Sequence, residues 1–477
     1  MSSKEFTLER LQPLNEKLFT KIRNEHFKPS FDIPGLKYLR DKAGNERNLR
    51  ELYRGRAPYE LLQNADDAGA TKVAFIVLRD GLGFLHDGNW FTVGNFISLA
   101  DGWSDKDPKE CIGHKGLGFR SVLDITPSPY LIKISNDEFL AIKFSWALNN
   151  GHIQEAFKTK PDLKNEYELW KEKGQSICPV MAIPGLAKKA SLGLASQLFD
   201  RVRHGDLGTA YTTLFLFPSE DSAIEKKVLE DLDPMPLSIP RKGKEVLVSF
   251  MEKEGVRILP YLKSVKKMSV LENEVTICEV EVEGERTAQG VISIDIAIGS
   301  RNEKNSFFEF RKSLPIPDAV KKYPGTPKAL KQISETEIVL SVRVKNDQPV
   351  SDRASRFHVY FPTEEVTGVG FSIHSDFFVK PDRTHLVPGN LFNDWLLNKI
   401  ADIASGPFLS ELLIRFRPSA VFTALAPTDQ NGSSSPFLNH FQEHLKTRTD
   451  AFLPTRIGLR NRSEVVVPPR IDTGGFW

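Results

Sequence analysis

The stretch Pro58-Tyr59-Glu60-Leu61-Leu62-Gln63-Asn64-Ala65-Asp66-Asp67-Ala68-Gly69 decides the fold of the first half of this chain. Pro58 suits the first turn of a helix, and Gly69 suits the left-handed residue that follows a helix end. Glu60, Asn64 and Asp67 are spaced i, i+4 and i+7, so they share one face of that helix, and the leucines and alanine between them can be buried on the other. Asn is a poor helix former, so Asn64 in mid-helix indicates that its amide is used. A solvated polar face is the competing interpretation.

A second stretch, Ile112-Gly113-His114-Lys115-Gly116-Leu117-Gly118-Phe119-Arg120-Ser121, is rich in glycine and precedes a helix-like segment. Glycine permits positive φ and a close approach of the backbone to an anion, and successive N–H groups that lead into a helix form a phosphate site. A P-loop requires GxxxxGK followed by Ser or Thr, and a dinucleotide fingerprint requires GxGxxG directly after a strand. The order here is GxxGxG after a polar loop, so both are excluded. A phosphate-binding lid of another type is predicted, with an ordinary surface loop as the competing interpretation.

Together, the two stretches resemble the signature of the GHKL superfamily, which includes the large heat-shock chaperone, DNA gyrase B, MutL and histidine kinases. The resemblance is closest to the sacsin-type branch with the plant NO VEIN proteins. It rests on the run 60–70, on Ile112 to Phe119 with Ser121-Val122 and Ile125-Thr126 after it, and on Thr213 to Pro218, which resembles the strand that closes the nucleotide domain. It covers residues 45–220 and implies an α+β protein with a Bergerat-type α/β sandwich that binds ATP and Mg²⁺.

The resemblance also implies roles for single residues. Glu60 is the expected general base that orients the attacking water, and Asn64 the expected ligand of Mg²⁺, an ion that prefers oxygen ligands. Asp67 is expected to line the nucleotide pocket, Asp87 to accept from the adenine amino group, and Thr213 to support the adenine side. The phosphates are expected to be wrapped by Gly113, Lys115, Gly116, Leu117, Gly118 and Phe119.

Two departures from the superfamily pattern affect the adenine contacts. The usual second motif is DxGxG, whereas Asp87 is followed at once by Gly88, so its register against adenine is open. The glycine that usually precedes the adenine-side threonine is replaced by Thr212, which leaves Thr209 as a competitor of Thr213.

Past residue 250 the resemblance continues more weakly and implies a transducer-like α/β middle domain. Its segments are 257–262, 361–365, 376–377 and 382–383. In the heat-shock chaperone an arginine of the middle domain reaches the γ-phosphate, and Arg383 is the residue similarly placed here. A cation there would stabilise charge that develops in phosphoryl transfer, and a surface arginine beside Asp382 is the competing interpretation.

The expected domains are a helical extension (1–43), the ATP-binding domain (44–220), a helical connector (221–255), the middle domain (256–426), and a linker with the start of a further region (427–477). Helices are expected at 5–28, 44–54 and 391–415, and the last forty residues are expected to be irregular. Strands are expected at Thr71–Leu78, Gly83–His86, Tyr130–Ile134, Phe139–Phe144 and Thr212–Phe217, then near 267–272, 275–282, 290–299, 337–345, 356–361 and 369–374. The abrupt ending suggests a fragment of a longer polypeptide.

Composition limits the partners. The 477 residues carry 64 basic and 62 acidic side chains, a net charge of +2, which argues against direct nucleic-acid binding by this segment and against a membrane surface. The 3 cysteines form no disulfide framework or metal-binding pair, so we expect a reducing, cytoplasmic setting.

The resemblance implies that ATP binding closes the lid and promotes a homodimer or larger assembly, with a partner protein as a further expectation. The setting would be a chaperone-like protein or a large bacterial protein of antiviral defence. Two alternatives stay open, namely a nucleotide-gated binding scaffold with little turnover and a nucleic-acid-processing ATPase of the MutL or topoisomerase type.

Overall fold

In the computed structural model the stretch 58–69 forms a helix, α4 (Ala57–Asp67), with proline in its first turn. Gly69 follows with a φ of 74°, so the predicted left-handed helix end is confirmed. The structure describes residues 9–28, 36–78, 81–101, 118–134, 139–173, 178–189, 211–218, 243–272, 275–283, 289–324, 326, 331, 333–380, 383–428, 435–447, 452–455 and 458–461.

The chain divides into two compact units. The first comprises Met1–Gly255, Leu262–Val280 and Ala297–Ser300, and the second Val256–Tyr261, Glu281–Ile296 and Arg301–Trp477. Two strands, β8 (Val275–Glu283) and β9 (Gln289–Ile298), contribute residues to both. Helices and a mixed sheet together confirm the α+β class. The Bergerat arrangement stays a prediction.

A mixed sheet forms the centre of the first unit, in the order β7-β1-β2-β6-β3-β4-β5. Only the β1–β7 pair in this series is parallel. That pairing places the strand expected at 267–272 in the first unit, although the sequence assigned it to the middle domain. The strands are β1 (Lys72–Leu78), β2 (Gly81–His86), β3 (Tyr130–Lys133), β4 (Leu140–Lys143), β5 (Gly185–Leu186), β6 (Thr213–Pro218) and β7 (Lys267–Glu272).

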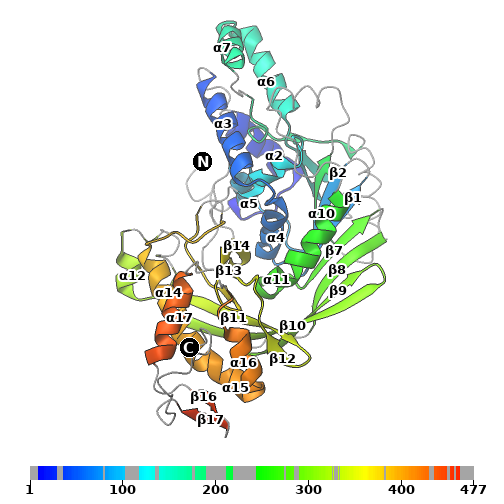
Figure 1. The fold of residues 1–477 in the computed structure, drawn as a ribbon. Coiled ribbons are helices and arrows are strands. Elements are labelled where there is room, and N and C mark those ends of the chain that lie inside the picture. The colour runs from blue at the N-terminus through cyan, green and yellow to red at the C-terminus, as the bar shows by residue number, and fades with distance from the viewer. Residues whose placement is uncertain are drawn as a thin grey trace. The chain divides into compact units, whose positions relative to one another are not determined.

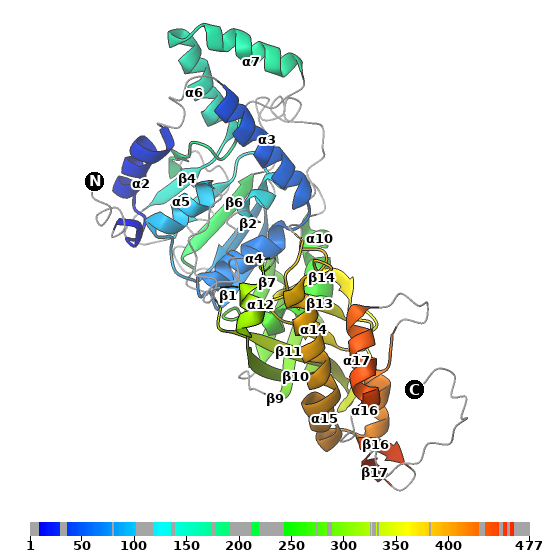
Figure 2. The same cartoon turned by 90° about the vertical axis from the view of Figure 1, so that its left-hand side faces the viewer.

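One face of this sheet carries a row of phenylalanines and is covered by helices. Phe75, Phe84 and Phe215 lie opposite one another across β1, β2 and β6, so they share one face. In Figure 2 α4 and α5 lie over that region of the sheet, and Phe96 of α5 stacks on Phe144 with ring centroids 6.0 Å apart. The helices are α2 (Glu16–Ile22), α3 (Lys37–Leu52), α4, α5 (Val93–Asp101), α6 (Trp146–Thr159), α7 (Asp162–Glu172) and α10 (Gly243–Phe250), with shorter turns η1 (Arg23–Phe27), η3 (Gly118–Asp124) and η5 (Met251–Gly255).

In the second unit a sheet in the order β14-β13-β15-β11-β10, with β12 on β11, packs against helices (Figure 1). Phenylalanines from both layers form its core, for example Phe308 and Phe408 with ring centroids 6.3 Å apart. The strands are β10 (Arg301–Pro315), β11 (Glu335–Lys345), β12 (Gln348–Val350), β13 (Arg356–Val359), β14 (Phe361–Val366), β15 (Ser372–His374), and the separate pair β16 (Phe452–Thr455) and β17 (Gly458–Asn461). The helices are α11 (Val256–Ile258), η6 (Leu259–Tyr261), α12 (Asp318–Lys322), α14 (Leu391–Ile403), η7 (Ala404–Phe408), α15 (Leu409–Arg415), α16 (Pro418–Leu425) and α17 (Pro436–Thr447).

Several expected elements differ from the structure. The long strand β10 was not predicted, and α17 with the β16–β17 hairpin corrects the expectation of an irregular end. Within the helix expected at 5–28, the structure describes the α-helix α2 at Glu16–Ile22, where the Asn15 side chain accepts from the Leu18 N–H at 2.9 Å. The helix expected at 44–54 begins earlier, at Lys37, and the one at 391–415 is interrupted by a π-turn that contains Pro407.

Candidate functional site

The polar face of α4 is the starting point of the site. Glu60 is buried, with 4% of its surface exposed, and Asn64 and Asp67 are half-buried. All three lie within one uninterrupted helix, so the spacing predicted from the sequence is realised along a single face. Two carboxylates and one carboxamide therefore line one side of α4.

The neighbouring Asp66 has a different task. Its carboxylate accepts from the backbone N–H groups of Lys263 at 2.9 Å, Ser264 at 2.7 Å and Val265 at 2.9 Å, all within the first unit. Burial raises the pKa of the Asp66 carboxyl, and the three N–H donors oppose that rise. Asp66 thus fixes the segment that leads into β7 and points away from the polar face of α4.

The turn after β2 is joined closely to the end of α4. Asn89 donates its N–H to the Ala68 carbonyl at 2.8 Å. A Cβ at Gly88 would lie 2.8 Å from the Ala68 oxygen and 2.8 Å from the Ala70 nitrogen, so only glycine fits there. The first and second motifs of the sequence are therefore in direct backbone contact.

Asp87 is engaged by this same junction. Its Oδ1 accepts from the Thr71 N–H at 2.7 Å and the Lys72 N–H at 2.9 Å, and its Oδ2 accepts from the Thr71 hydroxyl at 2.6 Å. The carboxylate caps the start of β1. The adenine contact expected of Asp87 stays a prediction, and the structure gives this side chain an intramolecular role that the sequence did not indicate.

The start of β6 meets the turn from the other side. The Thr212 hydroxyl donates to the Gly88 carbonyl, and the Thr212 N–H donates to the His86 carbonyl at 3.0 Å. Thr213, fully buried, lies directly across from His86 in the β2–β6 pair. Of the two threonines considered for the adenine side, Thr213 therefore lies beside the second motif, while Thr209 falls outside the described residues.

The end of the glycine-rich stretch packs onto the same sheet face. Gly118 begins η3, and the buried Phe119 ring lies 5.3 Å from Phe215 and 6.4 Å from Phe144. Arg120, also buried, donates to the Ala100 carbonyl at 2.8 Å. The predicted phosphate residues Gly113, Lys115, Gly116 and Leu117 lie outside the described residues.

A buried carboxylate lies behind this segment. Burial raises the pKa of Glu46, and the charge of Arg120 opposes that rise. The Glu46 carboxylate accepts from the N–H groups of Val180 at 2.6 Å and Met181 at 2.9 Å. Arg120 thus ties the residues after the glycine-rich stretch to the end of α5, in an environment set partly by Glu46.

Arg383 belongs to the second unit. Its φ is 58°, in the left-handed region, and its N–H donates to the Lys380 carbonyl at 2.8 Å. The role expected for Arg383 at the γ-phosphate stays a prediction.

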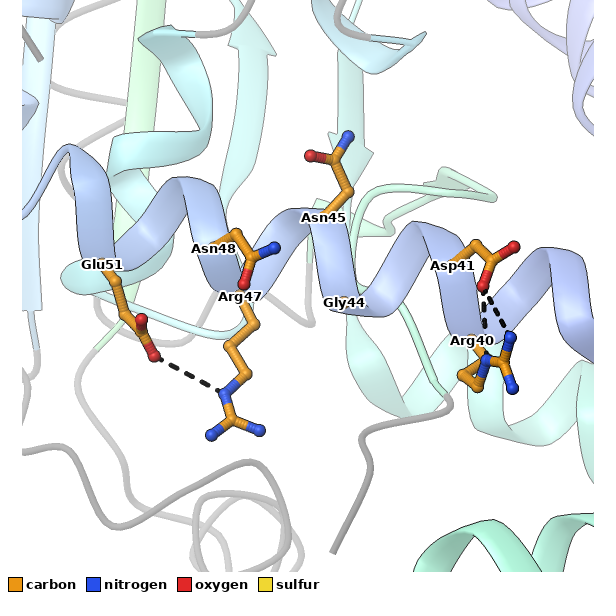
Figure 3. Close-up of a pocket in the computed structure, with 7 residues that line it drawn as sticks. All are labelled: Arg40, Asp41, Gly44, Asn45, Arg47, Asn48 and Glu51. Atoms are coloured by element: carbon orange, nitrogen blue, oxygen red, sulfur yellow. Dashed lines mark hydrogen bonds and ion pairs between the residues drawn. The ribbon is translucent and has the colours of Figure 1, made fainter. Parts of the chain in front are cut away.

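A surface pocket of about 490 Å³ lies along α3, lined by Arg40, Asp41, Gly44, Asn45, Arg47, Asn48 and Glu51 (Figure 3). Arg47 pairs with Glu51 at 3.6 Å and Arg40 with Asp41 at 3.0 Å, and these pairs are solvated, so they contribute little to stability. None of the predicted site residues lines this pocket. We therefore place the candidate site at α4 and the β2 turn instead.

The sequence did not indicate two of the residues that matter at this junction, His86 and Asp66. The alternation Phe84, His86 within a strand was a signal that His86 faces the phenylalanine side. The hydrogen bonds that Asp66 accepts come from residues nearly two hundred positions later, so no local sequence pattern predicts them.

Among the described residues, no cluster of three or more His, Cys, Asp or Glu side chains is arranged to hold a metal ion. The oxygen-bearing face of α4 nevertheless suits Mg²⁺, which takes one or two protein oxygens and fills its other positions with phosphate oxygens and water. No described helix has the length and apolar character needed to cross a bilayer.

Comparison with known proteins gives no family. No family model matches the chain, and no curated protein matches it. Among solved structures, the N-terminal domain of a DNA repair protein aligns with 73% of this chain and 93% of its own length, at 10% identity and a TM-score of 0.34. A likeness this distant supports no conclusion about fold or function.

Proposed function

We propose that the first unit binds Mg·ATP and hydrolyses it. The observation that supports this proposal is the meeting of separate motif segments at one place. The end of α4 contacts the Gly88 turn, that turn contacts Thr212 at the start of β6, and Phe119 packs on Phe215 of the same strand. Each of these segments belongs to a motif that the sequence associates with nucleotide binding.

In this proposal Glu60 is the general base. Hydrolysis of the γ-phosphate needs a group that orients water and accepts its proton, a contribution of roughly 10²–10⁴ in rate. Glu60 has 4% of its surface exposed and lies within the uninterrupted helix α4, so its side chain is enclosed by its surroundings. Asp67, further along the same face, would line the nucleotide pocket.

Asn64 would hold Mg²⁺ through its carboxamide oxygen. When bound, the ion supplies positive charge that neutralises the phosphates. Asn64 is one helical turn from Glu60, so the ion-binding group and the base would act from one helix. The glycine-rich stretch that ends at Phe119 would supply backbone N–H donors to the phosphates.

The test uses Glu60→Ala, Asn64→Ala and a matched control, Glu51→Ala, which removes an exposed carboxylate of the α3 pocket. We expect Glu60→Ala to lower phosphate release at least 100-fold and to change the calorimetric ATP affinity less than threefold. Asn64→Ala should lose at least tenfold in affinity for Mg·ATP. Glu51→Ala should match the wild type in both measurements.

Each outcome has a clear meaning. Full turnover by Glu60→Ala would remove this residue as the base, and loss of ATP binding by Glu51→Ala would move the site to α3. A wild-type chain that binds ATP without phosphate release would be a nucleotide-gated scaffold and would refute hydrolysis. Turnover that needs added DNA would identify a nucleic-acid-processing ATPase.

We further propose that ATP binding favours a dimer. Glu60→Ala, which is expected to hold ATP without cleaving it, should increase in mass with Mg·ATP in light-scattering chromatography, whereas Asn64→Ala should not. A constant monomer mass for both variants would refute dimerisation.

A further inference from the structure

His86 lies at the end of β2, where the motif segments of the first unit meet. Its side chain is 1% exposed, and it lies opposite the buried Thr213. Its ring centroid is 6.3 Å from that of Phe84 and 6.3 Å from that of Phe215. A polar ring therefore stands within an aromatic wall, on the face that also receives Phe119.

The ring of His86 has unused hydrogen-bonding capacity. Its Nδ1 is buried, and no hydrogen bond to it is found within the described part of the chain. A buried polar atom normally has a partner, and its absence calls for an explanation. Burial lowers the pKa of His86 to about 4, with the charge of Asp87 opposing, so the ring is neutral and can offer one acceptor and one donor.

Asp87, one residue later, is in the opposite situation. Both of its carboxylate oxygens accept from Thr71, and one also accepts from the Lys72 N–H. Using them for a ligand would release the start of β1. Between these two neighbours, only His86 combines a buried position with a vacant acceptor.

We propose that His86 reads the purine base, with its Nδ1 accepting from the exocyclic amino group and the Thr213 hydroxyl contacting the adjoining ring nitrogen. This inference rests on the proposed ATP site and assigns its base contact to His86 in place of Asp87. Phe215 beside the ring supplies an apolar wall of the kind that buries a flat base. One buried acceptor matched to one amino group favours adenine over hypoxanthine, which carries a carbonyl at that position.

The experiment compares ATP with inosine triphosphate, by calorimetry in the presence of Mg²⁺. The wild type should bind ATP about tenfold more tightly, the factor expected for one buried hydrogen bond. His86→Phe keeps an aromatic ring among phenylalanines and removes Nδ1, so its affinities for the two nucleotides should become equal. The control Asp87→Asn should melt at a lower temperature than the wild type and retain the tenfold preference.

A second measurement needs no substitution. In wild-type protein with ¹⁵N-labelled histidine, ATP should shift one imidazole signal into the pattern of an Nε2–H tautomer whose Nδ1 accepts a hydrogen bond. That signal should be the one missing from His86→Phe. A histidine that serves only packing would not respond to the base.

The outcomes separate the two proposals. A wild type that binds ATP and inosine triphosphate equally, or that binds ATP with no change in the His86 signal, would overturn the inference and leave the ATP site standing. An unchanged tenfold preference in His86→Phe would do the same. A wild type that binds neither nucleotide would overturn both proposals.

Discussion

Removing the carboxylate of Asp66 should loosen the first unit without touching the nucleotide chemistry. The side chain is 3% exposed and accepts from three consecutive N–H groups, those of Lys263, Ser264 and Val265, at 2.7–2.9 Å. These contacts join α4 to the segment that carries β7. Since β7 pairs with β1 directly after this segment, Asp66 helps to hold that strand against β1.

The size of the effect follows from the donors. A hydrogen bond to a charged acceptor contributes about 1.5–3 kcal/mol, and the three are not additive because they share one carboxylate. The Lys263 and Ser264 contacts are partly exposed, so water can replace some of the loss, while the Val265 contact is buried. We expect Asp66→Ala to lower the free energy of unfolding by about 3–5 kcal/mol. Asp66→Asn keeps one oxygen and should lose about 1–2 kcal/mol.

Urea unfolding gives the free energy, and hydrogen exchange of the Val265 amide reports the local contact. Asp67→Ala, the next residue along, is the matched control and should stay within about 1 kcal/mol of the wild type while weakening ATP binding. An Asp66→Ala variant as stable as the wild type, with Val265 still protected, would refute the argument. A greater loss from Asp67→Ala than from Asp66→Ala would reverse the assignment of the two carboxylates.

Three further predictions concern other parts of the chain. Gly88→Ala should lower the free energy of unfolding by about 2–4 kcal/mol in thermal or urea melts, because its Cβ would lie 2.8 Å from backbone atoms. The control Gly44→Ala, whose Cβ would lie in open space on α3, should be neutral or stabilising. Equal melting of the two variants would contradict this prediction. Burial lowers the pKa of His358 to about 3, so below pH 6.5 the unfolded chain takes up a proton at this residue that the folded chain does not. The stability that depends on His358 is present above that pH and falls by about 2 kcal/mol at pH 5, so the loss between pH 7 and pH 5 should be smaller by about 2 kcal/mol in His358→Asn than in the wild type, in a pH series of urea melts. Cys178 and Cys278 are buried, and burial raises the pKa of the Cys178 thiol, so both should resist alkylation in the native protein and react once it unfolds; rapid native labelling of either, detected by mass spectrometry, would place that thiol at the surface.

The sequence predicted the elements whose signals are local. Pro58 and Gly69 mark the ends of α4, and short hydrophobic runs mark β1, β2 and β6. The sequence did not predict the strand β10, because its first residues, Arg301 to Lys304, are polar and exposed. Its extended state depends on pairing, for instance with β11 over Ser306–Pro315, and pairing of that kind is not written in a window of sequence.

For the site, spacing predicted which residues share a face and could not predict which of them the chain itself engages. Asp66 and Asp67 are adjacent and chemically identical, yet the carboxylate of Asp66 accepts hydrogen bonds from the backbone N–H groups of residues 263–265. The place of Asp87 in a motif predicts a ligand contact, whereas in the structure Thr71 donates to its carboxylate. A single histidine in a strand has no diagnostic pattern, so the sequence does not indicate a role for His86. Its significance depends on burial and on a nitrogen that has no hydrogen-bond partner among the described residues, and both follow from three-dimensional packing.

The parallel pairing of β7 with β1 also determines when the first unit can finish folding during protein synthesis. The first unit needs residues 262–280, although the motifs that define its site end near residue 218. A nascent chain that has emerged only as far as β6 would expose the outer edge of β1, whose Val73, Phe75 and Val77 make it a template for unwanted strand pairing. The unit should therefore gain protection from proteases only after β7 has emerged. Truncated chains that stop short of residue 272 should aggregate more readily than chains that extend through residue 300, where the first unit ends.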